Sequence, residues 1–233
     1  MIELAVFDMA GTTVEDGDAV NASFRAALSS ASIEVDPVAV NAVMGLPKPE
    51  AIRILLSGNC HQVSDLLVDA IHEDFVRRMR EHYEFDPFVR EVPGAAAAFA
   101  ALRRAGILVA LNTGFSRTIC ATLLSRLGWH APAVIDADVA SDEVPRGRPH
   151  PDMIRLLMSR LGIKDPSRVA KVGDTRADLE EGANAGCGLV IGVTSGTFTR
   201  EELRTYPHTH ILDSVAEVPT LVFSSQTGDG SAL

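Results

Sequence analysis

The sequence predicts an α/β fold in which helices cover a parallel sheet and a separate helical segment is inserted near the N-terminus. Two observations predict it. Short apolar runs alternate with stretches of helix length through most of the 233 residues, a pattern typical of βαβ units. Residues 18–84 break this alternation, because they are helical in pattern throughout and contain no convincing strand.

The first predicted strand, residues 2–7, fixes the position of the first candidate functional residue. Its apolar run Leu4-Ala5-Val6-Phe7 is typical of a buried parallel strand, and Asp8 follows directly. Ligands of open α/β sheets bind at the carboxyl ends of the strands. A carboxylate at this place can act as a nucleophile or as a metal ligand.

The inserted segment is predicted to form a cap of four helices over the sheet. Asp16-Gly17-Asp18 and Phe85-Asp86-Pro87 would form its hinges. The predicted domains are a catalytic core, residues 1–17 and 85–233, and a helical cap domain, residues 18–84. The four cap helices are expected at residues 19–30, 37–44, 49–56 and 63–83.

The remaining strands and helices are predicted to alternate from residue 94 onward. Glycine and proline mark several boundaries, since Pro93-Gly94 opens a helix and Gly106 and Gly162 close two others. The strands are expected at residues 107–112, 133–135, 168–172, 189–193 and 210–212. The helices are expected at residues 94–105, 116–127, 151–161 and 176–185.

The composition limits the partners and the location of the protein. The net charge of −10 argues against a nucleic-acid partner, because such proteins carry a basic surface. No apolar stretch reaches the ~18 residues of a membrane span, and the N-terminus has no basic leader. The scattered cysteines, Cys60, Cys120 and Cys187, favour free thiols. We therefore expect a cytoplasmic protein that binds neither nucleic acid nor membrane.

Three further strand-end loops carry candidate site residues. Thr113 follows the second strand, Arg148 precedes a later helix, and Asp174 and Asp178 follow the fourth strand. Each residue alone also fits an ordinary role, as a helix cap, a surface charge or part of a solvated helix face. Together with Asp8 they form a set that could hold a hard cation and a phosphoryl group.

The four loops, in order and across nearly the whole chain, resemble the four signature motifs of the haloacid dehalogenase superfamily. The details are similar to its phosphonatase-like members, which implies a Rossmann-like core with a helical cap. The resemblance is carried by Asp8-Met9-Ala10-Gly11-Thr12-Thr13-Val14, Met44-Gly45-Leu46-Pro47-Lys48, Val144-Pro145-Arg146-Gly147-Arg148-Pro149 and Lys171-Val172-Gly173-Asp174-Thr175.

The resemblance implies a role for each matching residue. Asp8 resembles the nucleophile that attacks phosphorus and binds Mg²⁺, and Lys48 resembles the lysine that forms a Schiff base with an aldehyde. Thr113 and Arg148 resemble the phosphoryl-binding pair. The implied Mg²⁺ site comprises Asp8, the Ala10 carbonyl, Asp174 and Asp178. The expected substrate-binding residues are Thr12, Met44, Gly45 and Gly114.

Ala10 and Lys48 also indicate the chemistry from first principles. Phosphatases of this superfamily carry an acid two residues after the nucleophile, and Ala10 cannot protonate a leaving alkoxide. A C–P bond needs an electron sink instead, and a protonated lysine imine supplies one. Arginine cannot form an imine, which would explain why Lys48 stands in a chain where three of 21 basic residues are lysines.

Three positions depart from phosphonatase itself. Ala51 replaces a histidine thought to shuttle protons, Asp18 replaces a cysteine and Phe115 replaces a tyrosine. These positions border the substrate pocket in the family. The carbon skeleton of the substrate and the acid–base partner of Lys48 are therefore left open.

The preferred interpretation is an Mg²⁺-dependent hydrolase that cleaves the C–P bond of a 2-oxoalkyl phosphonate such as phosphonoacetaldehyde. Its partner would be a small phosphonate or phosphorylated substrate, and family analogy suggests a homodimer formed through the caps. One alternative is hydrolysis of phosphate esters, with an acid other than residue 10. Another is a catalytically silent module that closes on a phosphorylated metabolite. A haloacid dehalogenase is disfavoured, because it needs no pair of metal ligands.

Overall fold

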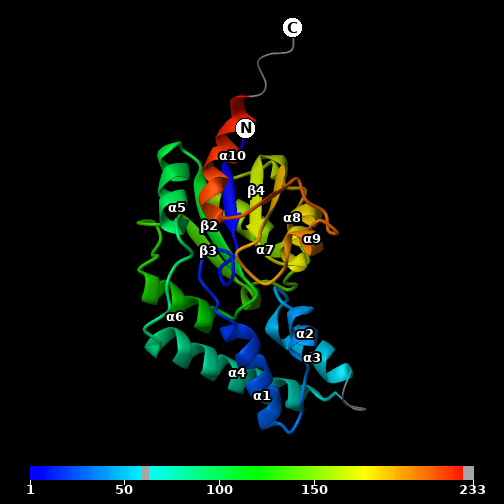
Figure 1. Ribbon diagram of the computed structural model, residues 1–233. Coiled ribbons are helices and arrows are strands. Elements are labelled where there is room, and N and C mark those ends of the chain that lie inside the picture. The colour runs from blue at the N-terminus through cyan, green and yellow to red at the C-terminus, as the bar shows by residue number, and fades with distance from the viewer. Residues whose placement is uncertain (59–62, 228–233) are drawn as a thin grey trace.

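The centre of the molecule is a six-stranded parallel sheet, seen in a computed structural model that describes residues 1–58 and 63–227 (Figure 1). The strand order is β3-β2-β1-β4-β5-β6, so the α/β prediction is confirmed. Strands β2 and β3 lie on one side of β1 and strands β4 to β6 on the other, so the strand order reverses between β1 and β4, where open sheets bind their ligands. The strands are β1 (Leu4–Phe7), β2 (Leu108–Thr113), β3 (Ala137–Ala140), β4 (Val169–Gly173), β5 (Leu189–Val193) and β6 (His210–Leu212).

Helices cover both faces of the sheet, because side chains along β1 alternate between two hydrophobic clusters. Leu4 and Val6 pack with residues of α7, whereas Ala5 and Phe7 pack with residues of α5, α6 and α10. The helices that flank the sheet are α5 (Ala95–Arg104), α6 (Arg117–Leu127), α7 (Asp152–Leu161), α8 (Arg176–Ala185), α9 (Arg200–Leu203) and α10 (Val218–Thr227).

The helical insert, α1–α4, lies at the end of the sheet where β1 runs into α1 (Figure 1). Helix α4 packs against α1 and α3 and also against α6. The Phe24 and Phe75 rings, 4.5 Å apart between centroids, join α1 to α4. The insert comprises α1 (Ala19–Ser30), α2 (Pro37–Asn41), α3 (Lys48–Ser57) and α4 (Asp65–Phe85).

One hydrophobic cluster continues from the insert into the sheet and includes both Phe24 and Phe7. The insert is therefore packed onto the rest of the chain through apolar side chains. The division into a cap domain, residues 18–84, and a core stays a prediction. Helix α4 ends at Phe85, which the sequence had suggested as a hinge residue.

One predicted strand is wrong. Residues 131–134 form a turn, in which the Val134 amide donates to the His130 carbonyl at 2.9 Å, and β3 begins later, at Ala137. The apolar run 133–135 has the composition of a strand, which led to the wrong prediction. It follows Pro132, which has no amide hydrogen for a ladder hydrogen bond. The strand that pairs with β2 carries Asp138 and has less apolar character.

The helices and cysteines of the described chain add two observations. No helix within residues 1–58 and 63–227 is both long and apolar enough to cross a membrane. Cys120 is buried and Cys187 half-buried, both as free thiols. Cys60 lies outside the described residues.

Candidate active site

Asp8 lies at the carboxyl end of β1, between β2 and β4. Its amide donates to the Val172 carbonyl at 2.9 Å, which continues the pairing of β1 with β4 by one residue. Its carboxylate is 5% exposed, and Oδ1 accepts a hydrogen bond from Arg148 Nη1 at 2.6 Å. Burial raises the pKa of Asp8, although Arg148 opposes this rise. Asp8 is thus held in a fixed orientation at the switch point of the sheet.

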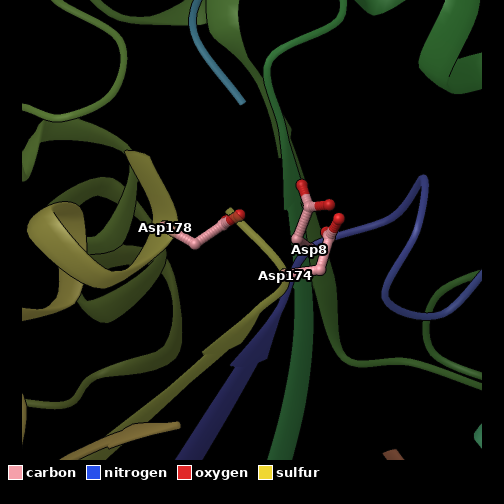
Figure 2. A group of neighbouring side chains, drawn as sticks. All are labelled: Asp8, Asp174 and Asp178. Atoms are coloured by element: carbon pink, nitrogen blue, oxygen red, sulfur yellow. The ribbon is translucent and has the colours of Figure 1, made fainter. Parts of the chain in front are cut away.

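Three buried carboxylates meet at this end of the sheet. Oxygen atoms of Asp8, Asp174 and Asp178 all lie within 4.8 Å of one another. Figure 2 shows Asp8 and Asp174 together at the ends of β1 and β4, with Asp178 approaching from the first turn of α8. Such a group of oxygen ligands is typical of a site for a hard divalent cation.

Asp174 provides the clearest test of whether a cation fits. Its carboxylate accepts hydrogen bonds from Thr12 Oγ1 at 2.9 Å and from the Thr197 amide at 2.7 Å. No lysine or arginine of the described chain pairs with it. Burial, followed by the neighbouring charges of Asp8 and Asp178, raises the pKa of Asp174 to about 8. A buried carboxylate that lacks a countercharge is what Mg²⁺ would neutralise.

Arg148 is the main cation of the site and is 1% exposed. Besides Asp8, it contacts Asp178 Oδ1 at 2.9 Å and Glu181 Oε2 at 3.1 Å, and it donates to Asn112 Oδ1 at 2.6 Å. These contacts orient the guanidinium from several sides. Arg148 therefore occupies a defined position beside the nucleophile candidate.

Lys171 adds a second buried cation, which the sequence did not identify as a site residue. Its Nζ contacts Asp178 Oδ1 at 2.8 Å and Glu181 Oε2 at 3.4 Å, and donates to Asn112 Oδ1 at 2.8 Å. Burial raises the pKa of Asp178, but Arg148 and Lys171 outweigh burial and lower it overall. Asp178 is therefore ionised and shared between these cations and the carboxylate group.

Asn112 and Glu181 were also missed as members of the site. The Asn112 amide donates to both carboxylate oxygens of Glu181 at 2.9 Å. Glu181 lies three residues after Asp178 on α8, so the two share a helix face. The spacing of Asp178 and Glu181, together with Lys171 as one of only three lysines, was the sequence signal that could have identified Glu181.

Lys48 enters the site from the insert as the first residue of α3. Its side chain is 4% exposed, and Nζ lies 5.3 Å from the Phe24 ring centroid and 5.0 Å from that of Phe115. No hydrogen bond or ion pair joins this Nζ to any residue in the described ranges. Burial lowers the pKa of Lys48 to about 8, with Asp8 opposing the effect and Arg148 adding to it. Roughly a tenth of the amine is therefore neutral at pH 7, far more than for an exposed lysine.

The loop before α3 joins the insert to the strand ends at two glycines. A side chain on Gly45 would come within 2.2 Å of Thr175 Oγ1, and one on Gly114 within 2.7 Å of the Leu46 carbonyl. Thr113 lies beside this contact, and its Oγ1 accepts from the Phe115 amide at 3.1 Å. Close approach at these glycines brings Lys48 over the sheet.

A small cavity, about 30 Å³ in volume, lies between the insert and the strand ends. It has room for about two water molecules. Thr12 does not line it, because its hydroxyl is bound to Asp174. Asp16 lines it and was considered only as a hinge residue. The sequence-predicted residues that line the cavity are Asp8, Ala10, Met44, Gly45, Lys48, Thr113, Gly114 and Arg148.

Comparisons with known proteins were made with the whole sequence and with the fold. A family model described as haloacid dehalogenase-like hydrolase matches residues 2–186. The phosphonoacetaldehyde hydrolase of Bacteroides fragilis is 30% identical over 239 residues, covering 93% of this chain and 87% of the relative. A Dickeya dadantii protein named "Probable phosphatase IndB" is 32% identical over 220 residues, covering 94% and 92%.

A solved structure supports the same grouping. The crystal structure of a phosphonoacetaldehyde hydrolase-like protein from Oleispira antarctica superimposes with a TM-score of 0.79 at 25% identity. The match covers 100% of this chain and 96% of that one. The similarity thus includes the insert as well as the sheet.

Proposed function

Because this chain belongs to the haloacid dehalogenase-like hydrolases, we propose that it cleaves the C–P bond of a 2-oxoalkyl phosphonate such as phosphonoacetaldehyde, with Mg²⁺ as cofactor. The observation that carries this proposal is the Lys48 amine. It is buried, its pKa is lowered to about 8, and it faces the same cavity as Asp8. A neutral amine beside a carboxylate nucleophile is what a two-adduct mechanism requires.

The proposed reaction begins at Lys48. Its neutral amine adds to the aldehyde, and the adduct takes up a proton from water and loses a water molecule, which gives a protonated imine. Asp8 then attacks phosphorus, and the electron pair of the breaking C–P bond moves into the imine to form an enamine. Protonation of the enamine carbon and hydrolysis of the imine release the aldehyde, and water releases phosphate from Asp8.

The other proposed site residues would bind the charged phosphonate group and Mg²⁺. Arg148 and Thr113 border the cavity beside Asp8 and are suited to holding phosphonate oxygens. Mg²⁺, when held by Asp8, Asp174 and the Ala10 carbonyl with Asp178 beside them, would neutralise charge on the phosphonate. The Thr12, Met44, Gly45 and Gly114 contacts with substrate stay predictions.

The test is reductive trapping of the wild-type protein. Incubation with phosphonoacetaldehyde is expected to release phosphate and acetaldehyde, and added borohydride is expected to fix a two-carbon adduct on Lys48, located by peptide mass mapping. Absence of both C–P cleavage and an adduct, in a preparation that hydrolyses an aryl phosphate, would contradict the proposal.

Hydrolysis of phosphate esters is a second candidate function, favoured by one observation. Asp16 lines the cavity and could act as the acid that Ala10 cannot provide. The relative named as a phosphatase supports the same candidate. Rapid hydrolysis of an alkyl phosphate with no phosphonoacetaldehyde turnover would favour it.

A silent binding module is the third candidate, and the combined presence of the site residues argues against it. Asp8, Thr113 and Arg148 border one cavity, and Asp174 lies beside Asp8. A module that only bound a metabolite would not need a nucleophile so placed. We propose small phosphonate or phosphorylated substrates as the partners, and a homodimer and the absence of a nucleic-acid partner stay predictions.

A further inference from the structure

The proposed reaction needs a proton donor that the predicted site residues do not supply. The enamine formed on Lys48 must gain a proton at carbon before the imine can be hydrolysed. Ala10 and Ala51 have no titratable group. Arg148 keeps its proton, because its three carboxylate neighbours raise its pKa further above the ordinary range despite burial. Another acid must therefore reach the cavity.

Asp16 has the required position. It lines the cavity together with Lys48 and Asp8. Its Oδ1 accepts from the Val20 amide at 3.2 Å, and its carbonyl accepts from the Ala19 amide at 2.8 Å, so the start of α1 fixes the residue. Its Oδ2 makes no hydrogen bond or ion pair with residues 1–58 or 63–227. One carboxylate oxygen is thus free to exchange a proton.

Asp16 also borders a second, outer pocket of about 250 Å³ that exposed residues line, among them Gly17 and Asp18. Asp16, Met44 and Thr197 line both spaces. The carboxyl group therefore lies between the Lys48 cavity and an outer pocket that water can reach.

We infer that Asp16 is the acid that protonates the enamine carbon on Lys48 and regains its proton from water in the outer pocket. This inference rests on the proposed C–P cleavage. The Asp16 O–H bond breaks and its proton goes to the terminal enamine carbon, while the enamine electron pair forms the new C–H bond and the protonated imine returns. Water in the outer pocket then reprotonates the carboxylate.

The electrostatics of Asp16 fit this role. Burial raises its pKa, while the hydrogen bond from Val20 and the positive charge of Lys48 act against burial. Conversion of Lys48 into a neutral enamine removes that positive charge, which raises the pKa of Asp16 further and favours its acid form at this step. The other titratable groups that act on it are Asp18, which raises the pKa, and His82 of α4, which lowers it. Tyr83 keeps its proton, because burial and the nearby Asp16 raise its pKa.

The experiment is rapid-quench kinetics of Asp16→Asn with phosphonoacetaldehyde. Asparagine keeps an acceptor for the Val20 amide but cannot donate an acidic proton. C–P cleavage precedes the blocked step, so one equivalent of acid-labile phosphate per active site is expected at the wild-type rate. Later turnovers are expected to slow by about a hundredfold or more, as for loss of a general acid. Asp16→Glu is expected to restore multiple turnovers.

Two controls separate this inference from structural damage. Glu84→Gln removes an exposed carboxylate of α4 that lines neither pocket, and it is expected to turn over like the wild type. Hydrolysis of an aryl phosphate, which needs no acid for its leaving group, is expected to be unchanged in Asp16→Asn.

The outcomes distinguish the two proposals. Wild-type multiple turnover by Asp16→Asn, or loss of its first turnover together with the later ones, would overturn the role of Asp16 and leave C–P cleavage intact. A wild-type protein that neither cleaves the phosphonate nor traps an adduct would overturn the proposed function instead. A single fast turnover followed by a stalled one supports the inference.

Discussion

At the scale of single residues, the surroundings of Lys48 change what a lysine can do. Burial, without a hydrogen-bond partner within residues 1–58 and 63–227, disfavours the ammonium form of Lys48 more than the faces of Phe24 and Phe115 stabilise it. Lys48 is also the first residue of α3, after Pro47 at the N-cap. The positive end of the helix dipole disfavours a cation at this position. The residue is therefore prepared for nucleophilic addition, a role that charge alone would not supply.

Lys48→Arg should separate the two halves of the mechanism. Arginine keeps the positive charge but cannot form an imine. We expect C–P cleavage and borohydride trapping to be lost while hydrolysis of an aryl phosphate continues. The matched control is Lys164→Arg at an exposed lysine, which should change neither activity. Wild-type cleavage of the phosphonate by Lys48→Arg would show that Lys48 only steers the substrate by charge.

The pH dependence of imine formation should follow Lys48. Because its pKa is lowered to about 8, the neutral fraction rises about tenfold per pH unit below that value and levels off above it. We expect kcat/KM for the phosphonate to rise with pH and to level off above pH 8, unlike kcat/KM for an aryl phosphate. Identical profiles for the two substrates would contradict a neutral Lys48 nucleophile.

Asp8→Asn should remove phosphoryl transfer with any substrate. The amide keeps the size of the carboxylate but is a poor nucleophile, so turnover should fall by at least about a thousandfold. Initial rates with the phosphonate and with an aryl phosphate both test this. Arg148 would keep Asp178 and Glu181 as partners, and an unchanged melting temperature would show that the fold persists. A loss of only a few-fold would limit Asp8 to binding.

At the scale of elements, the site depends on loops that approach the strand ends closely. The loop after β5 bears directly on the carboxylate group, because the Thr197 amide donates to Asp174 and Ser195 Oγ donates to the Gly11 carbonyl at 2.9 Å. These contacts fix the position of a predicted metal ligand from two segments distant in sequence. The loop after β5 thus shapes the candidate cation site.

Gly196→Ala should weaken metal binding. A side chain at residue 196 would lie 2.0 Å from Asp174 Oδ2, so the loop or the carboxylate must move. We expect the Mg²⁺ concentration for half-maximal activity to rise severalfold, measured with an aryl phosphate. The control is Gly58→Ala, where the nearest atom is 3.8 Å away. Equal Mg²⁺ dependence in both variants would show that the loop yields freely.

At the scale of the whole molecule, the candidate site residues come together because the insert packs against the sheet. Asp8, Arg148 and Asp174 come from the strand ends, whereas Lys48 comes from the insert. The apolar cluster shared by both parts stabilises the closed arrangement through burial of side chains such as Phe24 and Phe75.

Mg²⁺ removal should abolish phosphate release, and added Mg²⁺ should restore it. Binding of the cation must displace the proton that Asp174 holds below its pKa of about 8. Apparent Mg²⁺ affinity should therefore rise as pH increases toward 8. Activity titrations at pH 6 and pH 8 check this. Full activity in excess chelator would exclude the metal site.

Most of the sheet, most helices and much of the site could be predicted from the sequence. Apolar runs and helix periodicity are local signals, and Asp8, Thr113 and Asp174 directly follow or end strands that those signals identify. The failed strand at 133–135 shows the limit of this reasoning. There a short apolar run formed a turn, and pairing with β2 selected a segment containing Asp138 instead.

The sequence by itself determined the parallel α/β architecture, the order of the strand-end loops and the substitution of Ala10 for an acid. Only the tertiary structure decided that Lys48 is buried between Phe24 and Phe115 and that Asp16 borders its cavity. It also decided that Glu181 completes the ion network. Local patterns specify elements, whereas burial and the pKa of a group depend on neighbours that lie far away along the chain.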